Sequence, residues 1–205
     1  MNKLTKAGLA GGLGALLLLG GTTFALWTDS ASVAGGTITS GNLEVAAGTV
    51  AWHDVSADVT GTPTSITLAT YRIVPGDTIE GTFGLKGALD GDNLTADLAL
   101  TLDGVAATGS LLDGLDITYQ LFGADGITAL STSTALGSTA TVAFRSPNNT
   151  ATSVAALPTL PVDLPATDNL LVKVNVTFKT STTDTDLTQA TAELDDLGVT
   201  LSQTR

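Results

Sequence analysis

The sequence predicts an all-β fold, an antiparallel β-sandwich, and three features of the 205-residue chain support this prediction. The chain is rich in threonine and valine, whose branching at Cβ favours the extended backbone of a strand. Several short segments alternate apolar and polar residues, as strands with one buried face do. Turn-forming residues separate these segments at short intervals, which is typical of a sandwich.

Five segments carry the alternation of a strand, and the clearest is 170–179, where the period of two lasts ten residues. Its outward face holds Lys173, Asn175, Thr177 and Lys179. The residues that the five strands are predicted to turn inward are Leu94, Ala96, Leu98, Leu100 and Leu102; Leu115, Ile117, Tyr119 and Leu121; Val142 and Phe144; Leu170, Val172, Val174, Val176 and Phe178; and Leu197, Val199 and Leu201.

Between these strands we expect turns rich in Asp, Asn, Gly and Pro. They lie at Pro75-Gly76-Asp77, Asp90-Gly91-Asp92-Asn93, Asp103-Gly104, Asp113-Gly114, Asp125-Gly126 and Pro147-Asn148-Asn149. The segment 150–169 contains three prolines and is predicted to be a crossing connection, since proline is excluded from central strands. Apolar residues at helical spacing in 184–196 allow a short helix there.

The first 25 residues are predicted to be a helical signal peptide. Lys3 and Lys6 precede a charge-free run from Ala7 to Thr28, and the small residues Thr23 and Ala25 occupy positions −3 and −1 of a cut before Leu26. The run is long enough to anchor the chain in a bilayer. However, its strongly apolar part is short and no basic cluster follows, so we expect cleavage and only transient contact with the membrane.

Cleavage leaves 180 of the 205 residues, enough for one domain with a sizeable core, and the chain contains no cysteine. We expect a flexible arm at 26–36 and a sandwich domain at 37–205. The 20 acidic residues all follow the signal segment, whereas two of the eight basic residues lie within it. The mature net charge is therefore −14, which disfavours nucleic acid as a partner.

Several segments resemble the family exported through alternate, SipW-type signal peptides, which includes TasA-like matrix proteins and camelysin-like surface proteins. The stretch from Gly20 to Asp29 resembles the family's signal junction, with small residues before the cut and Trp27 and Asp29 after it. The stretch 37–45 resembles the first mature strand, and Val74-Pro75-Gly76-Asp77-Thr78 resembles a turn that leads into a strand. The segments 169–179 and 186–200 resemble the last two long strands.

This resemblance implies a jelly-roll-like sandwich, processing by a dedicated signal peptidase, and a place on the cell surface or in the biofilm matrix of a Gram-positive bacterium. It also implies a structural role as a fibre subunit. We expect the arm to donate a strand to a neighbouring copy, because head-to-tail strand addition builds filaments. The arm residues are Leu26, Trp27, Thr28, Asp29, Ser30, Ala31, Ser32 and Val33.

Two alternative functions remain, a camelysin-like surface peptidase and a monomeric cell-surface binding module. His53 is the single histidine, and the chain has no His-Glu-x-x-His motif and no thiol, so we expect no enzymatic activity, catalytic residue, metal or cofactor. Asp90-Gly91-Asp92-Asn93 offers oxygen ligands for calcium, but Thr101 stands where an EF-hand loop places its bidentate Glu. We therefore interpret that segment as a hairpin turn, with a weak calcium site left open.

Overall fold

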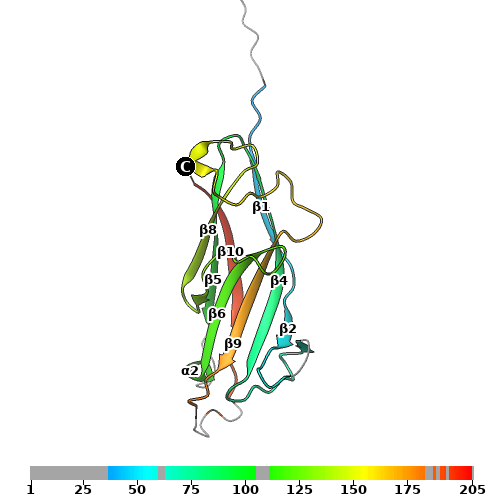
Figure 1. Ribbon diagram of the computed structural model, residues 1–205, viewed down its shortest axis with the longest axis vertical. Coiled ribbons are helices and arrows are strands. Elements are labelled where there is room, and N and C mark those ends of the chain that lie inside the picture. Colours follow the sequence, from blue (N-terminus) through cyan, green and yellow to red (C-terminus); the bar gives the residue numbers. More distant parts are fainter. Residues whose placement is uncertain are drawn as a thin grey trace, which may run out of the picture. The chain divides into compact units, whose positions relative to one another are not determined.

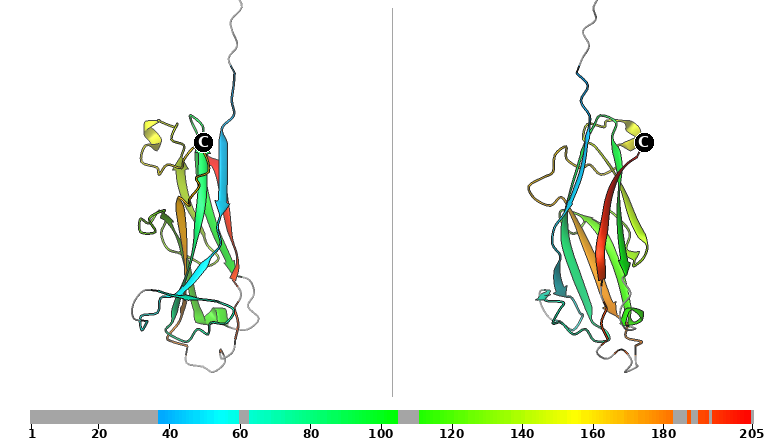
Figure 2. Two further views of the ribbon diagram at one scale, coloured as in Figure 1. Left: turned by 90° about the vertical axis from the view of Figure 1, so that its right-hand side faces the viewer. Right: turned by 180° about the vertical axis from the view of Figure 1, so that it is seen from behind.

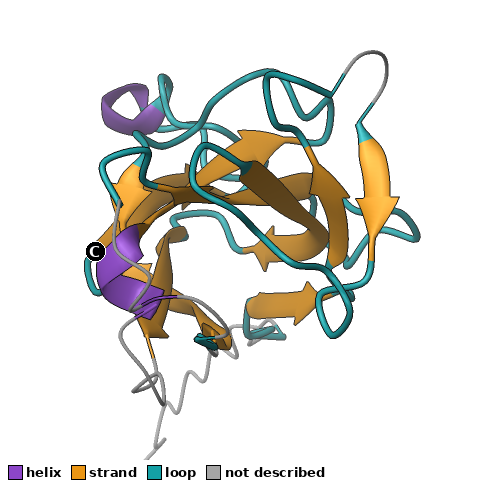
Figure 3. Cartoon of the chain, turned by 90° about the horizontal axis from the view of Figure 1, so that it is seen from below, coloured by secondary structure: helices purple, strands orange, loops and turns teal. Residues whose placement is uncertain are grey.

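A computed structural model describes residues 37–59, 63–104, 111–182, 187, 190–192 and 194–204. The described strands all belong to one compact unit, Thr39–Arg205, and form two antiparallel sheets that face each other (Figure 1). Strands make up both layers, and helices are short (Figure 3). The predicted signal-peptide helix at 1–25 lies outside the described residues.

The larger sheet has seven strands and the smaller has three. The larger sheet contains β1 (Asn42–Ala47), β2 (Ala51–Asp54), β3 (Thr64–Ile66), β4 (Thr78–Asp90), β6 (Leu115–Gly123), β7 (Thr134–Ala135) and β9 (Leu170–Phe178). The smaller sheet contains β5 (Thr95–Gly104), β8 (Thr139–Arg145) and β10 (Leu194–Thr204), with β5 in the middle. Short helical elements within the described residues include α2 (Leu111–Gly114) and the 3₁₀ turn η1 (Thr152–Val154).

The 13-residue strand β4 organises the larger sheet. One of its edges pairs with β9, and the other pairs with β2 along its first half and with β1 along its second half. Between these two short strands, the Gly48 amide donates to the Gly84 carbonyl at 2.9 Å. Thus β1 and β2 act as one interrupted strand.

Five connections between successive strands pass from one sheet to the other: β4–β5, β5–β6, β7–β8, β8–β9 and β9–β10. This alternation between layers is that of an antiparallel β-sandwich and confirms the predicted all-β sandwich fold. It also brings segments far apart in the chain together, since Thr95 bonds to Thr204 across 109 residues.

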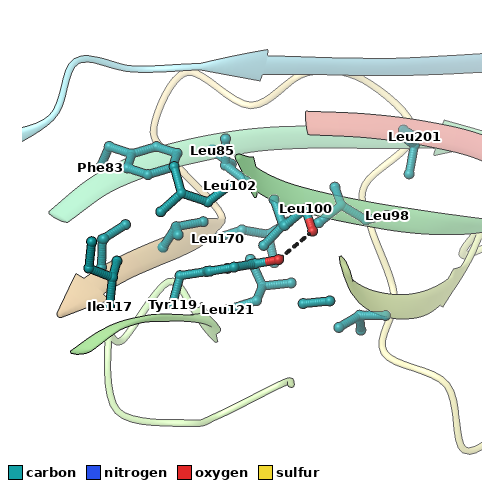
Figure 4. Packing of buried hydrophobic residues seen from close by; sticks show 14 of the residues in the cluster. Phe83, Leu85, Leu98, Leu100, Leu102, Ile117, Tyr119, Leu121, Leu170 and Leu201 are labelled. Carbon is teal, nitrogen blue, oxygen red and sulfur yellow. Dashed lines mark hydrogen bonds between the residues drawn. The ribbon is translucent and has the colours of Figure 1, made fainter. Parts of the chain in front are cut away.

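The core lies between the sheets and contains most of the residues predicted to point inward (Figure 4). In β9 the buried and half-buried positions alternate from Leu170 to Phe178 without a break. Leu94, Leu197 and Val199 are half-buried instead of buried. Tyr119 is fully buried, and its hydroxyl donates to the Leu100 carbonyl at 2.9 Å and also contacts the Ser138 carbonyl. The buried Tyr119 hydroxyl thus forms a hydrogen bond between the two layers, from β6 to β5.

The segment 150–169 is the predicted crossing connection, and it leads from β8 to β9. Its final part extends the pairing along β4 beyond the start of β9. The Asn169 side chain accepts from the Gly87 amide and donates to the Gly87 carbonyl, both at 2.9 Å. Further along, the Leu89 amide donates to the Pro161 carbonyl at 2.7 Å. The connection thereby satisfies backbone groups that would otherwise form an open edge.

Several local predictions are wrong. The first strand begins at Asn42 and not at Thr37. The turn at 90–93 is not a hairpin, because β4 and β5 belong to different sheets. By contrast, Asp103-Gly104 at the end of β5 and Asp113-Gly114 at the end of a helical turn before β6 do separate strands, as predicted.

The short helix predicted within 184–196 is wrong for the last three residues of that range, whereas Leu187 does lie in a 3₁₀ turn. Residues 194–196 begin β10, because the pairing of β10 with β5 overrides their local helical spacing. Of the remainder, only 187 and 190–192 are described.

Candidate functional site: an open groove between two sheet edges

An open groove lies where the edge of the larger sheet meets the edge of the smaller one. Its volume is about 730 Å³, and its lining comes from the start of β1, the β4–β5 corner and the end of β10. β1 (blue) and β10 (red) lie side by side in Figure 2. The lining residues are Ser40, Gly41, Asn42, Leu43, Asp90, Gly91, Asn93, Leu94 and Gln203.

The backbone edges of both strands are available at this groove. β1 pairs with β4 on one side, and β10 pairs with β5 on one side. No strand pairing among the described residues joins β1 to β10. An edge strand presents unpaired amide and carbonyl groups, which form a template for another extended chain. The groove therefore offers main-chain hydrogen bonds to a peptide backbone.

The side chains of the groove combine apolar and polar character. Leu43 and Leu94 are half-buried and pack against the core, whereas Asn42, Asn93 and Gln203 are exposed. Apolar residues set below a polar rim suit an extended peptide, because alternate side chains of a strand point in opposite directions.

The corner of the groove is built by close backbone packing. A Cβ atom added at Gly41 would lie 2.3 Å from the Asp90 carbonyl oxygen, so only glycine fits there. Asp90 also accepts a hydrogen bond at 2.9 Å through Oδ1 from Nδ2 of Asn148, which comes from the turn after β8. Asp90 thus forms part of the groove and contacts two other segments.

A second polar cluster surrounds Asp54 at the end of β2. The Asp54 carboxylate accepts from the Ser56 hydroxyl at 2.6 Å, from the Ser56 amide at 2.9 Å and from the Tyr71 hydroxyl at 2.8 Å. The hydrogen bonds from Ser56 and then from Tyr71 lower the pKa of Asp54. Burial, followed by the bond to Asp54, raises the pKa of Tyr71. Ser56 also accepts from the Thr78 amide at 3.0 Å, so the cluster closes the loop between β2 and β4.

This cluster does not form a Ser-His-Asp arrangement with His53. His53 and Asp54 are consecutive in β2 and so project to opposite faces of the sheet. His53 pairs with Glu80 of β4 and Ser65 of β3 and is half-buried. The hydroxyl of Ser56 is buried and bonded to the carboxylate. The geometry is that of a structural network.

Within the described part of the chain, no three His, Cys, Asp or Glu residues come together in a way that could hold a metal ion. The turn at 90–93 belongs to the groove, where Asp90 is bonded to Asn148.

Within the described part of the chain, no helix has the length and apolar character needed to cross a membrane.

The predicted cleavage residues Thr23, Ala25 and Leu26 and the predicted arm, Leu26–Val33, lie outside the described residues. The sequence did not predict the groove, because the groove joins segments about 160 positions apart and no local pattern marks it.

A scan against protein-family models finds no match, and a search of curated proteins likewise finds none.

Proposed function

We propose that the protein is a secreted structural protein, a TasA-like subunit of extracellular fibres that assemble by strand donation. In this proposal the arm 26–33 of one copy adds as a strand within the groove of the next copy. The observation that carries the proposal is the pair of unpaired sheet edges, β1 and β10, beside one open groove. The predicted signal segment, with an expected cut before Leu26 by a dedicated peptidase, supports a place on the surface or in the matrix of a Gram-positive cell.

The dimensions of the arm fit this edge. Eight residues in extended conformation span roughly 26 Å, and β1 contributes six residues to the edge. In a strand, Trp27, Asp29, Ala31 and Val33 share one face, and in this proposal its apolar members contact the half-buried Leu43 and Leu94. Burial of the Trp27 ring stabilises the contact by roughly 2–3 kcal/mol before ordering costs are subtracted. Because the donated strand leaves the subunit that provides it, the contact repeats head to tail and does not close.

The decisive experiment compares mature protein 26–205 with a form that lacks 26–33, at equal concentration, by sedimentation and electron microscopy. We expect filaments from the first and folded monomers from the second, because the core strands all begin at Asn42 or later. Trp27→Ala should weaken assembly and leave the melting temperature nearly unchanged. Thr28→Ala, on the opposite face of the arm, is the matched control and should assemble like the wild type.

Two results would overturn the proposal. If both forms remain monomeric, the groove serves another ligand and the protein is a surface-binding module. If both form the same filaments, the arm has no role in assembly. Chelator-sensitive cleavage of casein by the mature protein would instead support the peptidase alternative.

A further inference from the structure

We propose that Asn148 is a positioning residue for the groove: its side-chain amide fixes the Asp90 corner and thereby the end of the groove that receives the added strand. This inference rests on the proposed function, since it concerns the same groove. Asn148 does not line the groove. It acts on the bound strand only through Asp90.

The position of the corner is not fixed by sheet pairing alone. Asp90 is the last residue of β4 and pairs with Asn42, the first residue of β1. Beyond Asp90 the chain leaves the larger sheet to begin β5 in the smaller one. Because the ladder ends there, the corner needs support from outside the two strands.

Gly41 transmits any shift of the corner to β1. The ideal Cβ position of Gly41 lies 2.3 Å from the Asp90 oxygen and 3.6 Å from the Gly91 Cα, so the two backbones touch. Ser40, Gly41 and Asn42 all line the groove beside Asp90 and Gly91. Movement of Asp90 would therefore change the width of the groove as well as its end.

The turn that carries Asn148 is itself firmly anchored. Ser146 is fully buried, and its amide donates to the Leu94 carbonyl at 3.1 Å. Asn149 is 4% exposed and donates its side-chain amide to the same carbonyl at 3.4 Å. The backbone amide of Asn148 donates to the Ser146 hydroxyl at 3.2 Å. The exposed side chain of Asn148 thus reaches from a fixed turn to the corner at Asp90.

The test measures the critical concentration for filament formation by sedimentation of mature protein 26–205, together with the melting temperature. Asn148→Ala removes the bond to Asp90, and we expect the critical concentration to rise about three- to tenfold. The melting temperature should fall by less than about 3 °C, because Asn148 is exposed. Asn175→Ala removes an amide from the outer face of the larger sheet and should leave the critical concentration unchanged.

A charge exchange separates positioning from general stability. Asn148→Asp places two carboxylates together and should impair assembly more than Asn148→Ala does. The double variant Asp90→Asn with Asn148→Asp restores a donor and an acceptor in reversed order. It should return the critical concentration to within about twofold of the wild type.

Each failure has a distinct meaning. If the wild type assembles and Asn148→Ala has the same critical concentration, the positioning role is wrong and strand donation stands. If the double variant assembles no better than Asn148→Asp, the role is also wrong. If the wild type does not assemble at any concentration, the proposed function fails and this inference fails with it.

Discussion

Three glycines of β4 lie where side chains from other segments approach the strand closely, and none of the three forms a turn. Gly81 lies against the Trp52 ring, Gly87 against Leu160, and Gly84 under the carboxylate of Asp168. The Cβ positions at Gly81 and Gly84 lie within 3.0 Å of these neighbours. Glycine in a strand interior often marks such a close approach. These residues are spaced along the longest strand of the molecule and make room for groups from other segments.

Gly81→Ala should destabilise the fold by about 1–3 kcal/mol, since a methyl group would lie 2.8 Å from the Trp52 ring. Chemical denaturation of the two proteins measures the difference in the free energy of unfolding. Gly198→Ala in β10 is the matched control, because its Cβ would meet only the Thr101 carbonyl at an ordinary 3.5 Å. Equal stability of the two variants would show that Trp52 moves aside freely.

The Asp54 cluster predicts how stability depends on pH. The pKa of Asp54 is lowered, mainly by the Ser56 hydrogen bonds, so its contribution is present above the ordinary value of 3.8 and is lost as pH falls through the lower folded value. The pKa of Tyr71 is raised, so the unfolded state ionises first above about pH 10 and stability also declines there.

Ser56→Ala should raise the pKa of Asp54 toward 3.8, measured by NMR titration of its carboxyl carbon, and should reduce stability at neutral pH. Asp54→Asn should remove the contribution of this carboxyl group to the fall in melting temperature at acid pH. An unchanged Asp54 titration in Ser56→Ala would contradict the assignment of the hydrogen bonds as the cause.

At the level of elements, strands whose side chains alternate were predictable, whereas β4 was recognised only by the turn before it. In β9, Leu170 to Phe178 alternate because one face packs on the smaller sheet and the other meets solvent. The pattern fails in β4, where Gly84 and Ala88 are buried on the face that otherwise carries polar residues. The groove was not predictable for a related reason: its shape depends on which strands are left at the edges of the sheets.

The connection 150–169 supplies the prediction at this scale. Asn169→Ala removes both side-chain bonds to Gly87 and leaves two backbone groups of β4 without their partner. We expect a loss of about 1–3 kcal/mol in the free energy of unfolding. Faster hydrogen exchange at the Gly87 amide, with unchanged exchange in β6, would locate the effect. Asn175→Ala, in the neighbouring strand β9, is the control and should change neither the free energy of unfolding nor the exchange rate of the Gly87 amide by much.

For the whole molecule, the dominant electrostatic feature is the excess of acidic residues. Several of the basic groups are held by neighbouring oxygen atoms: Lys86 donates to the Ala166 carbonyl at 2.7 Å, and Lys179 to the Asp113 carbonyl at 2.9 Å. Lys173 lies 3.9 Å from Glu80 and over the Phe122 ring. Copies of the protein therefore repel one another at low salt, and assembly should be measured near physiological ionic strength.

The pairings of β5 with β10 and of β4 with β9 also limit how fast the chain reaches its native state. Thr95 must find Thr204, 109 residues away, and Thr78 must find Thr177, 99 residues away. Contacts of such high sequence separation place a domain among slow folders, with times of milliseconds to seconds. The smaller sheet has only β5 and β8 until β10 docks. If the protein is exported as proposed, the smaller sheet cannot be completed until β10, the last strand, has left the translocation channel.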